Sequence, residues 1–184
     1  MRYFFLVVMM AISTIGFAQK KKIQIPEMPM DNETQLITYT DKAEVAGASA
    51  PDLYDRAYNW GKGTYKNYAE KLRVQDKENG RIEIFGRFPI YAHDKKGNIT
   101  TSKAGVIQYT LGIDIKEGRY RCKLSKINLR SASYVAAEKW LDAFDQNAAN
   151  NAYKLIDLDA HILELLAGLN KALQTSPKAS DDDW

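Results

Sequence analysis

The sequence has few of the residues on which many enzymes and metal sites depend. It contains one cysteine, so no disulfide can form within the chain, and two histidines, too few to predict a histidine-rich metal site or catalytic triad. It also lacks a large charge of one sign, because 26 basic residues stand against 23 acidic ones, a net charge of +3. We therefore expect neither nucleic acid nor an anionic membrane as the main partner.

Apolar residues are plentiful enough for a folded core. Hydrophobic residues make up 45% of the chain and charged residues 27%, which excludes a wholly disordered, collagen-like or disulfide-framework protein. The length of 184 residues exceeds the roughly 150 of one typical domain by only a little. We expect one globular unit with modest extensions.

Long hydrophobic runs are missing, apart from a short one at the N-terminus. Residues 3–12 are apolar, follow Arg2, and lead to small residues at Gly16 and Ala18. This run is too short to span a bilayer and is typical of a secretory signal peptide over residues 1–18. We predict cleavage after Ala18 and a periplasmic or secreted product that does not span the membrane. The alternative, a membrane anchor, is disfavoured by the lysines at 20–22.

The centre of the chain has the periodicity of an α+β domain, placed at residues 35–130 after a polar leader at 19–34. Alternating residues predict a strand at 36–45, and Ser49 with Pro51 predicts a helix that continues to about Tyr65. The Asn79-Gly80 pair predicts a hairpin. Three further runs alternate between apolar and polar residues and indicate antiparallel strands; they lie at 81–91, 107–115 and 119–129, the last with a bulge near Lys126.

A C-terminal helical segment is expected at residues 131–175, followed by an acidic tail at 176–184. Apolar residues four apart predict one helix at 133–145, and a longer amphipathic helix is predicted at 153–174. Seven aliphatic residues form the stripe of the longer helix: Leu155, Leu158, Ile162, Leu165, Leu166, Leu169 and Leu173. A small sheet that already carries one helix has little room for this stripe. We therefore expect the surplus of the stripe to meet the second face of the sheet or another copy of the chain.

Several local motifs together resemble a known family. An acidic turn at 31–34 precedes the strand Ile37-Thr38-Tyr39-Thr40, and the strand ends at Glu44-Val45; the capped segment 49–60 and the 76–80 hairpin follow. Over residues 25–130 the chain resembles the DUF4468 family of secreted Bacteroidetes proteins. The resemblance implies a TBP-like fold, a curved antiparallel sheet of about five strands with one packed helix, followed by C-terminal helices. It implies no catalytic residue.

Candidate catalytic groups have plain structural interpretations. His161 shares its predicted helix face with Asp157 and Glu164, which favours a solvated histidine with acidic neighbours. Cys122 lies within a strand on the apolar face, which favours a small buried thiol. We predict no catalytic, cofactor-binding or metal-binding residues, and consider an enzyme less favoured than a binding protein.

Aromatic and basic residues remain as a possible binding surface: Tyr54, Tyr58, Phe85, Arg87, Tyr91, Arg119 and Arg121. Exposed tyrosine and arginine are enriched at interfaces, although tyrosines are also common on sheet surfaces and beneath a second helical layer. The leading hypothesis is an exported, non-enzymatic binding or interaction module of the bacterial cell envelope, with a protein or glycan partner. The alternative is a carboxylate-dependent hydrolase acting on a cell-wall or glycan substrate, which needs two carboxylates about 5–10 Å apart in a pocket.

Overall fold

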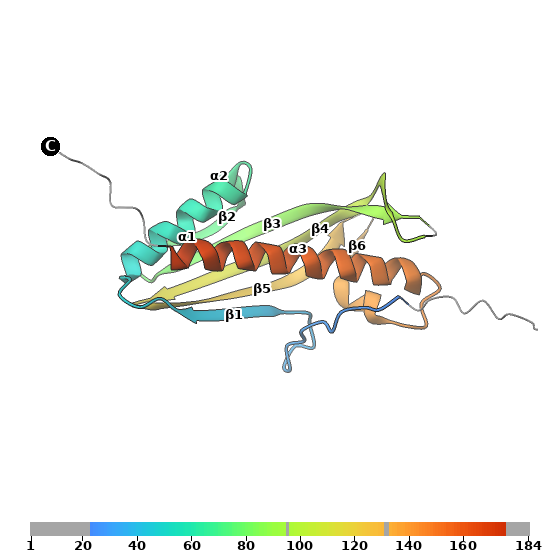
Figure 1. Cartoon of the computed structure of the whole chain (residues 1–184), viewed down its shortest axis with the longest axis horizontal. Coiled ribbons are helices and arrows are strands. Elements are labelled where there is room, and N and C mark those ends of the chain that lie inside the picture. The colour runs from blue at the N-terminus through green and yellow to red at the C-terminus, as the bar shows by residue number, and fades with distance from the viewer. Residues whose placement is uncertain (1–22, 95, 131–132, 176–184) are drawn as a thin grey trace, which may run out of the picture.

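A computed structural model describes residues 23–94, 96–130 and 133–175. The predicted signal peptide and the acidic tail lie outside the described residues. The elements are β1 (Tyr39–Glu44), α1 (Ala50–Thr64), α2 (Tyr68–Lys71), β2 (Leu72–Asp76), β3 (Arg81–His93), β4 (Ile99–Lys116), β5 (Arg119–Arg130), β6 (Tyr134–Ala136), the 3₁₀ helix η1 (Ala137–Leu141) and α3 (Ala148–Gln174) (Figure 1).

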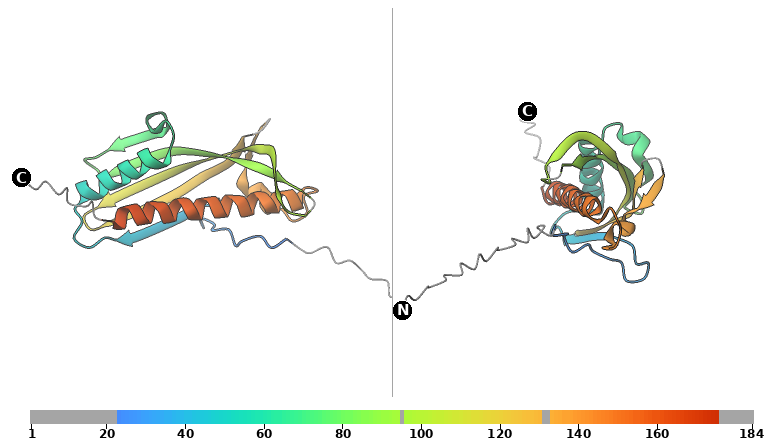
Figure 2. Two further views of the ribbon diagram at one scale, coloured as in Figure 1. Left: turned by 45° about the horizontal axis from the view of Figure 1, so that its top comes forward. Right: turned by 90° about the vertical axis from the view of Figure 1, so that its right-hand side faces the viewer.

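One antiparallel sheet organises the chain. Its strands lie in the order β1-β5-β4-β3-β2, and the short β6 pairs with β5, so the sheet has six strands where about five were expected. The sheet curls around α1 and α3, which lie on its inner side (Figure 2). The predicted α+β class and curved antiparallel sheet are therefore confirmed.

Turn and capping residues form the local structures that the sequence predicted. The Ser49 Oγ accepts a hydrogen bond from the Asp52 amide at 3.3 Å, and Pro51 occupies the first turn of α1. The Asp76 carboxylate accepts hydrogen bonds from Asn79, and Gly80 then adopts a φ of +64°. These bonds close the β2–β3 hairpin, so the predicted hairpin is confirmed.

Alternation along the strands separates an apolar inner face from an exposed outer face. On β3, Ile82 and Ile84 are fully buried, while Arg81 points outward. Gly86 faces inward too, and the ring of its cross-strand partner Tyr109 covers it so closely that an added Cβ would lie 2.1 Å from that ring. The predicted bulge of β5 is also confirmed, because the register with β4 shifts at Lys126–Ile127.

The aliphatic stripe of α3 packs inside this chain. All seven stripe residues are less than 9% exposed, and α3 lies beside α1 against the inner face of the sheet. The expectation that a surplus of the stripe needs the outer face or a second copy was therefore wrong. The sheet has strands of up to 18 residues and curls, so its inner face accommodates two helices.

The predicted helix at 133–145 is also wrong. Residues 134–136 form β6, which pairs with residues 128–130 of β5, and η1 follows. The reason lies in the sheet: β1 pairs only with residues 119–124 of β5, so the edge beyond the bulge is open for another strand. Two of the apolar residues four apart that suggested this helix now differ, because Trp140 is buried and Phe144 is 97% exposed.

α3 begins at Ala148, five residues before the predicted start, because Asn147 forms its N-cap and residues 148–151 form its first turn. No described helix is long and apolar enough to cross a membrane.

At the N-terminal end of the described residues, the leader pairs with the chain through an isolated antiparallel β-bridge between Met30 and Ile37, and the Met28 side chain is buried.

Candidate functional site

The outer face of the sheet collects four of the seven predicted surface residues. Phe85 and Arg87 lie on β3, and Arg119 and Arg121 lie on β5. All four belong to the outward set of their strands, and the three arginines are exposed. Phe85 is half-buried because the guanidinium of Arg73 lies 5.3 Å from the centre of its ring.

The three tyrosines of the predicted surface lie elsewhere. Tyr54 is only 2% exposed and belongs to the core beneath α1, so its assignment to an exposed surface was wrong. Tyr58, also on α1, packs edge-on against Tyr68 at 5.3 Å between ring centres. Tyr91 lies past a register shift in β3 and lines a pocket near the start of α3. The seven residues therefore do not form one surface.

The outer face is strongly basic. We define it by the outward charged residues of β1 to β5, nine basic and four acidic, and name it the outer basic face. Its surplus of five positive charges exceeds the +3 of the whole chain, so the remaining residues sum to −2. Its members are Lys42, Glu44, Arg73, Asp76, Arg81, Glu83, Arg87, Asp114, Lys116, Arg119, Arg121, Lys123 and Arg130.

Some of these cations are paired and others are available. Arg121 Nε lies 2.9 Å from Asp114 Oδ2, and Lys123 Nζ lies 3.0 Å from an oxygen of Asp31, whose pKa is lowered chiefly by the Thr34 amide and then by Lys123. Arg87 and Arg119 form no ion pair of 4.0 Å or less with any described residue. The face can therefore offer unpaired guanidinium groups to an acidic partner.

Sequence reasoning missed members of this face, including Lys42 and Lys116. A signal was present, since each has the outward parity of its strand in the printed sequence. What the sequence could not supply was the strand order, which places Lys42, Arg121, Asp114 and Arg81 in one row across four strands.

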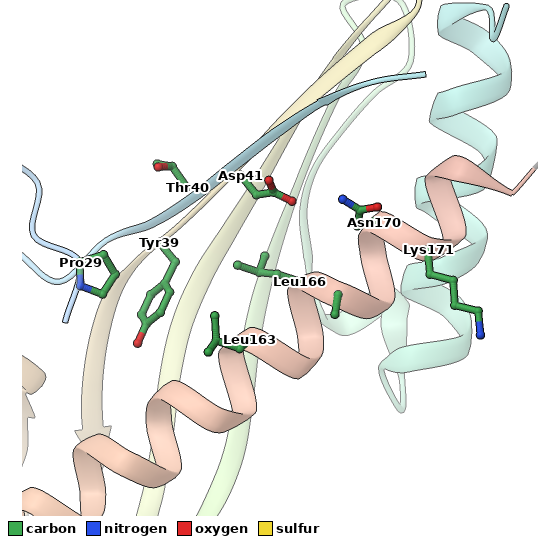
Figure 3. Close-up of a pocket in the computed structure, with 9 residues that line it drawn as sticks. Pro29, Tyr39, Thr40, Asp41, Leu163, Leu166, Asn170 and Lys171 are labelled. Carbon is green, nitrogen blue, oxygen red and sulfur yellow. The ribbon is translucent and has the colours of Figure 1, made fainter. Parts of the chain in front are cut away.

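A groove of about 590 Å³ runs between the edge strand β1 and α3. Tyr39 from β1 and Leu163 and Leu166 from α3 extend into it (Figure 3). The Tyr39 hydroxyl donates to Asp159 at 2.8 Å, and burial raises the pKa of this phenol, so it stays protonated. Because α3 bonds directly to this strand here, we interpret the groove as a seam that attaches the helix to the sheet edge.

A second hollow, of about 510 Å³, lies at the first turns of α3, and we name it the α3 pocket. Its other walls come from β3, β4, β5, the short β6 and η1. Its polar lining includes Lys139, Asp145, Asn151 and Lys154, and Trp140 is its buried aromatic residue. No sequence signal identified it, because its walls come from six elements that only the fold brings together.

The two histidines are packed, and the predicted solvated state of His161 was wrong. His161 stacks on Phe88 with 3.6 Å between ring centres, and burial lowers its pKa, an effect that Glu164 opposes. His93 stacks on Tyr153 at 4.4 Å, and its Nε2 lies 3.6 Å from Asp157 Oδ1. Both rings therefore have structural neighbours that attach the long hairpin to α3.

Cys122 is the small buried thiol that the sequence predicted. It is 2% exposed on the inner face of β5, and burial raises its pKa to about 12. A thiol in this state is a poor nucleophile at neutral pH.

The carboxylates do not pair in either hollow. Among the described residues, Asp41 is the one carboxylate that lines the groove, and Asp145 is the one that lines the α3 pocket. Within the same residues, no group of three or more histidine, cysteine or acidic side chains could hold a metal ion. The described linings of the two hollows therefore do not supply the two-carboxylate geometry of a glycosidase.

Comparisons with known proteins support the fold. Residues 39–130 match the family model of a domain of unknown function (DUF4468) with TBP-like fold. A TBP-like protein from Parabacteroides distasonis ATCC 8503 is similar in structure, with a TM-score of 0.65 and 19% identity over 82% of this chain and 99% of that one. A DUF4468 family protein from Bacteroides ovatus ATCC 8483 gives a TM-score of 0.61 and 15% identity over 84% and 93%. A search of curated proteins found no match.

Proposed function

The chain belongs to the DUF4468 family, and from this premise we propose that it is a non-enzymatic binding module whose outer basic face holds an acidic protein partner. The observation that carries the proposal is the placement of charge. The helices cover the inner face and leave the outer one open, and that face concentrates a positive surplus greater than the net charge of the chain. Complementary charge speeds association and sets the orientation of a complex.

The pattern of charges favours a protein over an acidic glycan. Acidic residues stand among the cations, with Asp114 between Arg81 and Arg121 in one row. A polymer of uniform negative charge would be repelled at that position. A protein surface can place a cation opposite Asp114 and carboxylates opposite Arg87 and Arg119. Specific interfaces use such complementary arrangements of both charge signs.

We place this module in the cell envelope as part of the same proposal. Residues 1–18 have the composition of a secretory signal peptide, and export would leave Gln19 as the first residue. Mass spectrometry of the protein from its native cells tests this directly. A mature N-terminus at Gln19 supports export, and retention of Met1 contradicts it.

Charge reversal tests the binding face. The double variant Arg87→Glu/Arg119→Glu changes two guanidinium groups that have no ion pair with a described residue, so the fold should tolerate it. Fluorescence anisotropy with a labelled poly-glutamate peptide should show binding to the wild type that weakens with salt. We expect the variant to lose at least about tenfold in affinity.

The matched control is Lys66→Glu/Lys96→Glu, two exposed lysines outside the outer basic face. It changes the net charge by the same amount, so equal losses in both variants would show that only total charge matters and would overturn the proposal. Tighter binding of polygalacturonate than of poly-glutamate would favour an acidic glycan and contradict the protein assignment. Circular dichroism melting verifies that both variants are folded.

A further inference from the structure

The α3 pocket has the size and lining of a small-molecule site. Its volume of about 510 Å³ falls within the range of about 300–1,000 Å³ that is usual for ligand pockets. None of its lining residues belongs to the outer basic face, so it is independent of the proposed function. Its apolar wall includes Leu129 and Val135, and the polar side is supplied by the start of α3.

Lys154 is the central cation of this pocket. Its Nζ donates to Asn151 Oδ1 at 3.0 Å and lies 5.5 Å from the centre of the Trp140 ring. No carboxylate of the described residues lies within 4.0 Å of it, although Asp145 acts on it from farther away. Burial lowers the pKa of Lys154, which indicates that its neighbours do not fully replace the water it has lost.

The groups beside Lys154 suit a hydroxylated ligand. Asn147, Asn150 and Asn151 all line the pocket, and an amide side chain both donates and accepts hydrogen bonds, as a sugar hydroxyl does. Asn151 is held within the wall, 4% exposed, so its amide has a fixed position. Lys139 at the exposed rim gives the pocket a second cation against the single carboxylate of Asp145.

We propose that the α3 pocket binds a sugar acid, with the carboxylate on Lys154, the hydroxyls on the asparagine amides and the ring against the apolar wall. A carboxylate would complete the partial solvation of the ammonium by forming a charge-assisted hydrogen bond. The three kinds of lining group are then all used by one ligand of monosaccharide size.

Titration of the full chain with glucuronate, followed by NMR, tests this assignment. The Trp140 indole and Asn151 amide signals should shift on addition of millimolar glucuronate and should shift far less with glucose. Lys154→Met keeps the alkyl chain that covers Trp140 but removes the charge, and it should weaken glucuronate binding roughly tenfold or more.

Lys171→Met is the control, because Lys171 is on the same helix but lines the groove instead. Unchanged binding in this control together with the loss in Lys154→Met supports the proposal. Absence of glucuronate shifts at the two signals overturns it, as does an equal loss in both variants. Inorganic phosphate that competes as well as glucuronate would also overturn the sugar-acid assignment, because it would show that the pocket takes a bare anion.

Discussion

The two faces of the sheet are built by the same strands and differ in almost every physical property. The inner face is aliphatic and aromatic, and α1 and α3 cover it. The outer face is basic and open. Alternation of side chains along each strand produces both at once, because neighbouring residues point to opposite sides. Stability is therefore concentrated on the inner face, and the outer face stays open to solvent.

The largest effect is expected where α3 meets the inner face. Leu158 is fully buried there, so Leu158→Ala should lower the free energy of unfolding by about 2–5 kcal/mol, through lost transfer energy and the cavity left behind. Leu163→Ala, on the exposed side of the same helix, should change it by no more than about 0.5 kcal/mol. Urea denaturation measures both. Similar values would mean that the helix does not pack as described.

A pair of glycines on neighbouring strands compares the two faces directly. Gly86→Ala places a methyl group against the Tyr109 ring on the inner side and should destabilise the protein by about 1–3 kcal/mol. Gly112→Ala meets only the Lys123 carbonyl oxygen at 3.8 Å on the outer side and should be tolerated within about 0.5 kcal/mol. Thermal melts measure the loss of stability in each variant. A larger loss for Gly112→Ala than for Gly86→Ala would contradict the assignment of the faces.

The ionisation and reactivity of the Cys122 thiol test how well the inner face is buried. Cys122→Ala should cost about 1 kcal/mol, by loss of a small buried group. Because the folded pKa of about 12 lies above the unfolded value, this thiol stabilises the fold below about pH 8.5, and that contribution declines as the pH rises toward 12. The alanine variant should lose less stability than the wild type between pH 8 and 10. Rapid labelling of the native thiol at pH 8 would contradict its burial.

His161 gives a smaller effect on the acid side. Burial lowers its pKa, so the folded state binds a proton less readily than the unfolded state, whose histidine titrates near pH 6.5. Its contribution to stability is complete above that pH and declines as the pH falls below it. His161→Gln should therefore flatten the loss of stability between pH 7 and 5. An NMR titration of the His161 ring that gave an ordinary pKa would oppose this.

The smallest change in stability is expected on the outer basic face. Arg119→Ala removes an exposed side chain without an ion pair to any described residue, so unfolding should shift by no more than about 0.5 kcal/mol. Binding to poly-glutamate should nevertheless weaken. Urea melts beside anisotropy measure the two quantities on one sample. A large destabilisation would show that Arg119 supports the fold, which would remove it from the proposed recognition surface.

Local signals in the sequence were sufficient where one residue or one short period decides the structure. The Ser49 cap, the 76–80 hairpin and the bulge near Lys126 were all predicted and are present. Alternation also placed Phe85, Arg87, Arg119 and Arg121 on the outward side of their strands. The prediction that Tyr54 is exposed failed because a tyrosine on a helix gives no local sign of whether its side of the helix faces the core, and here the core covers it.

The sequence by itself determined the elements, their polarity and the motifs of the family, because those depend on capping, turn chemistry and periodicity within a few residues. Only the tertiary structure decided that α3 shares the inner face with α1, that residues 134–136 form a strand on the open edge of β5, and that Lys154 meets Trp140 in a pocket. Each of these depends on contacts between segments distant in sequence, which strand order and sheet curvature establish and which no local pattern encodes.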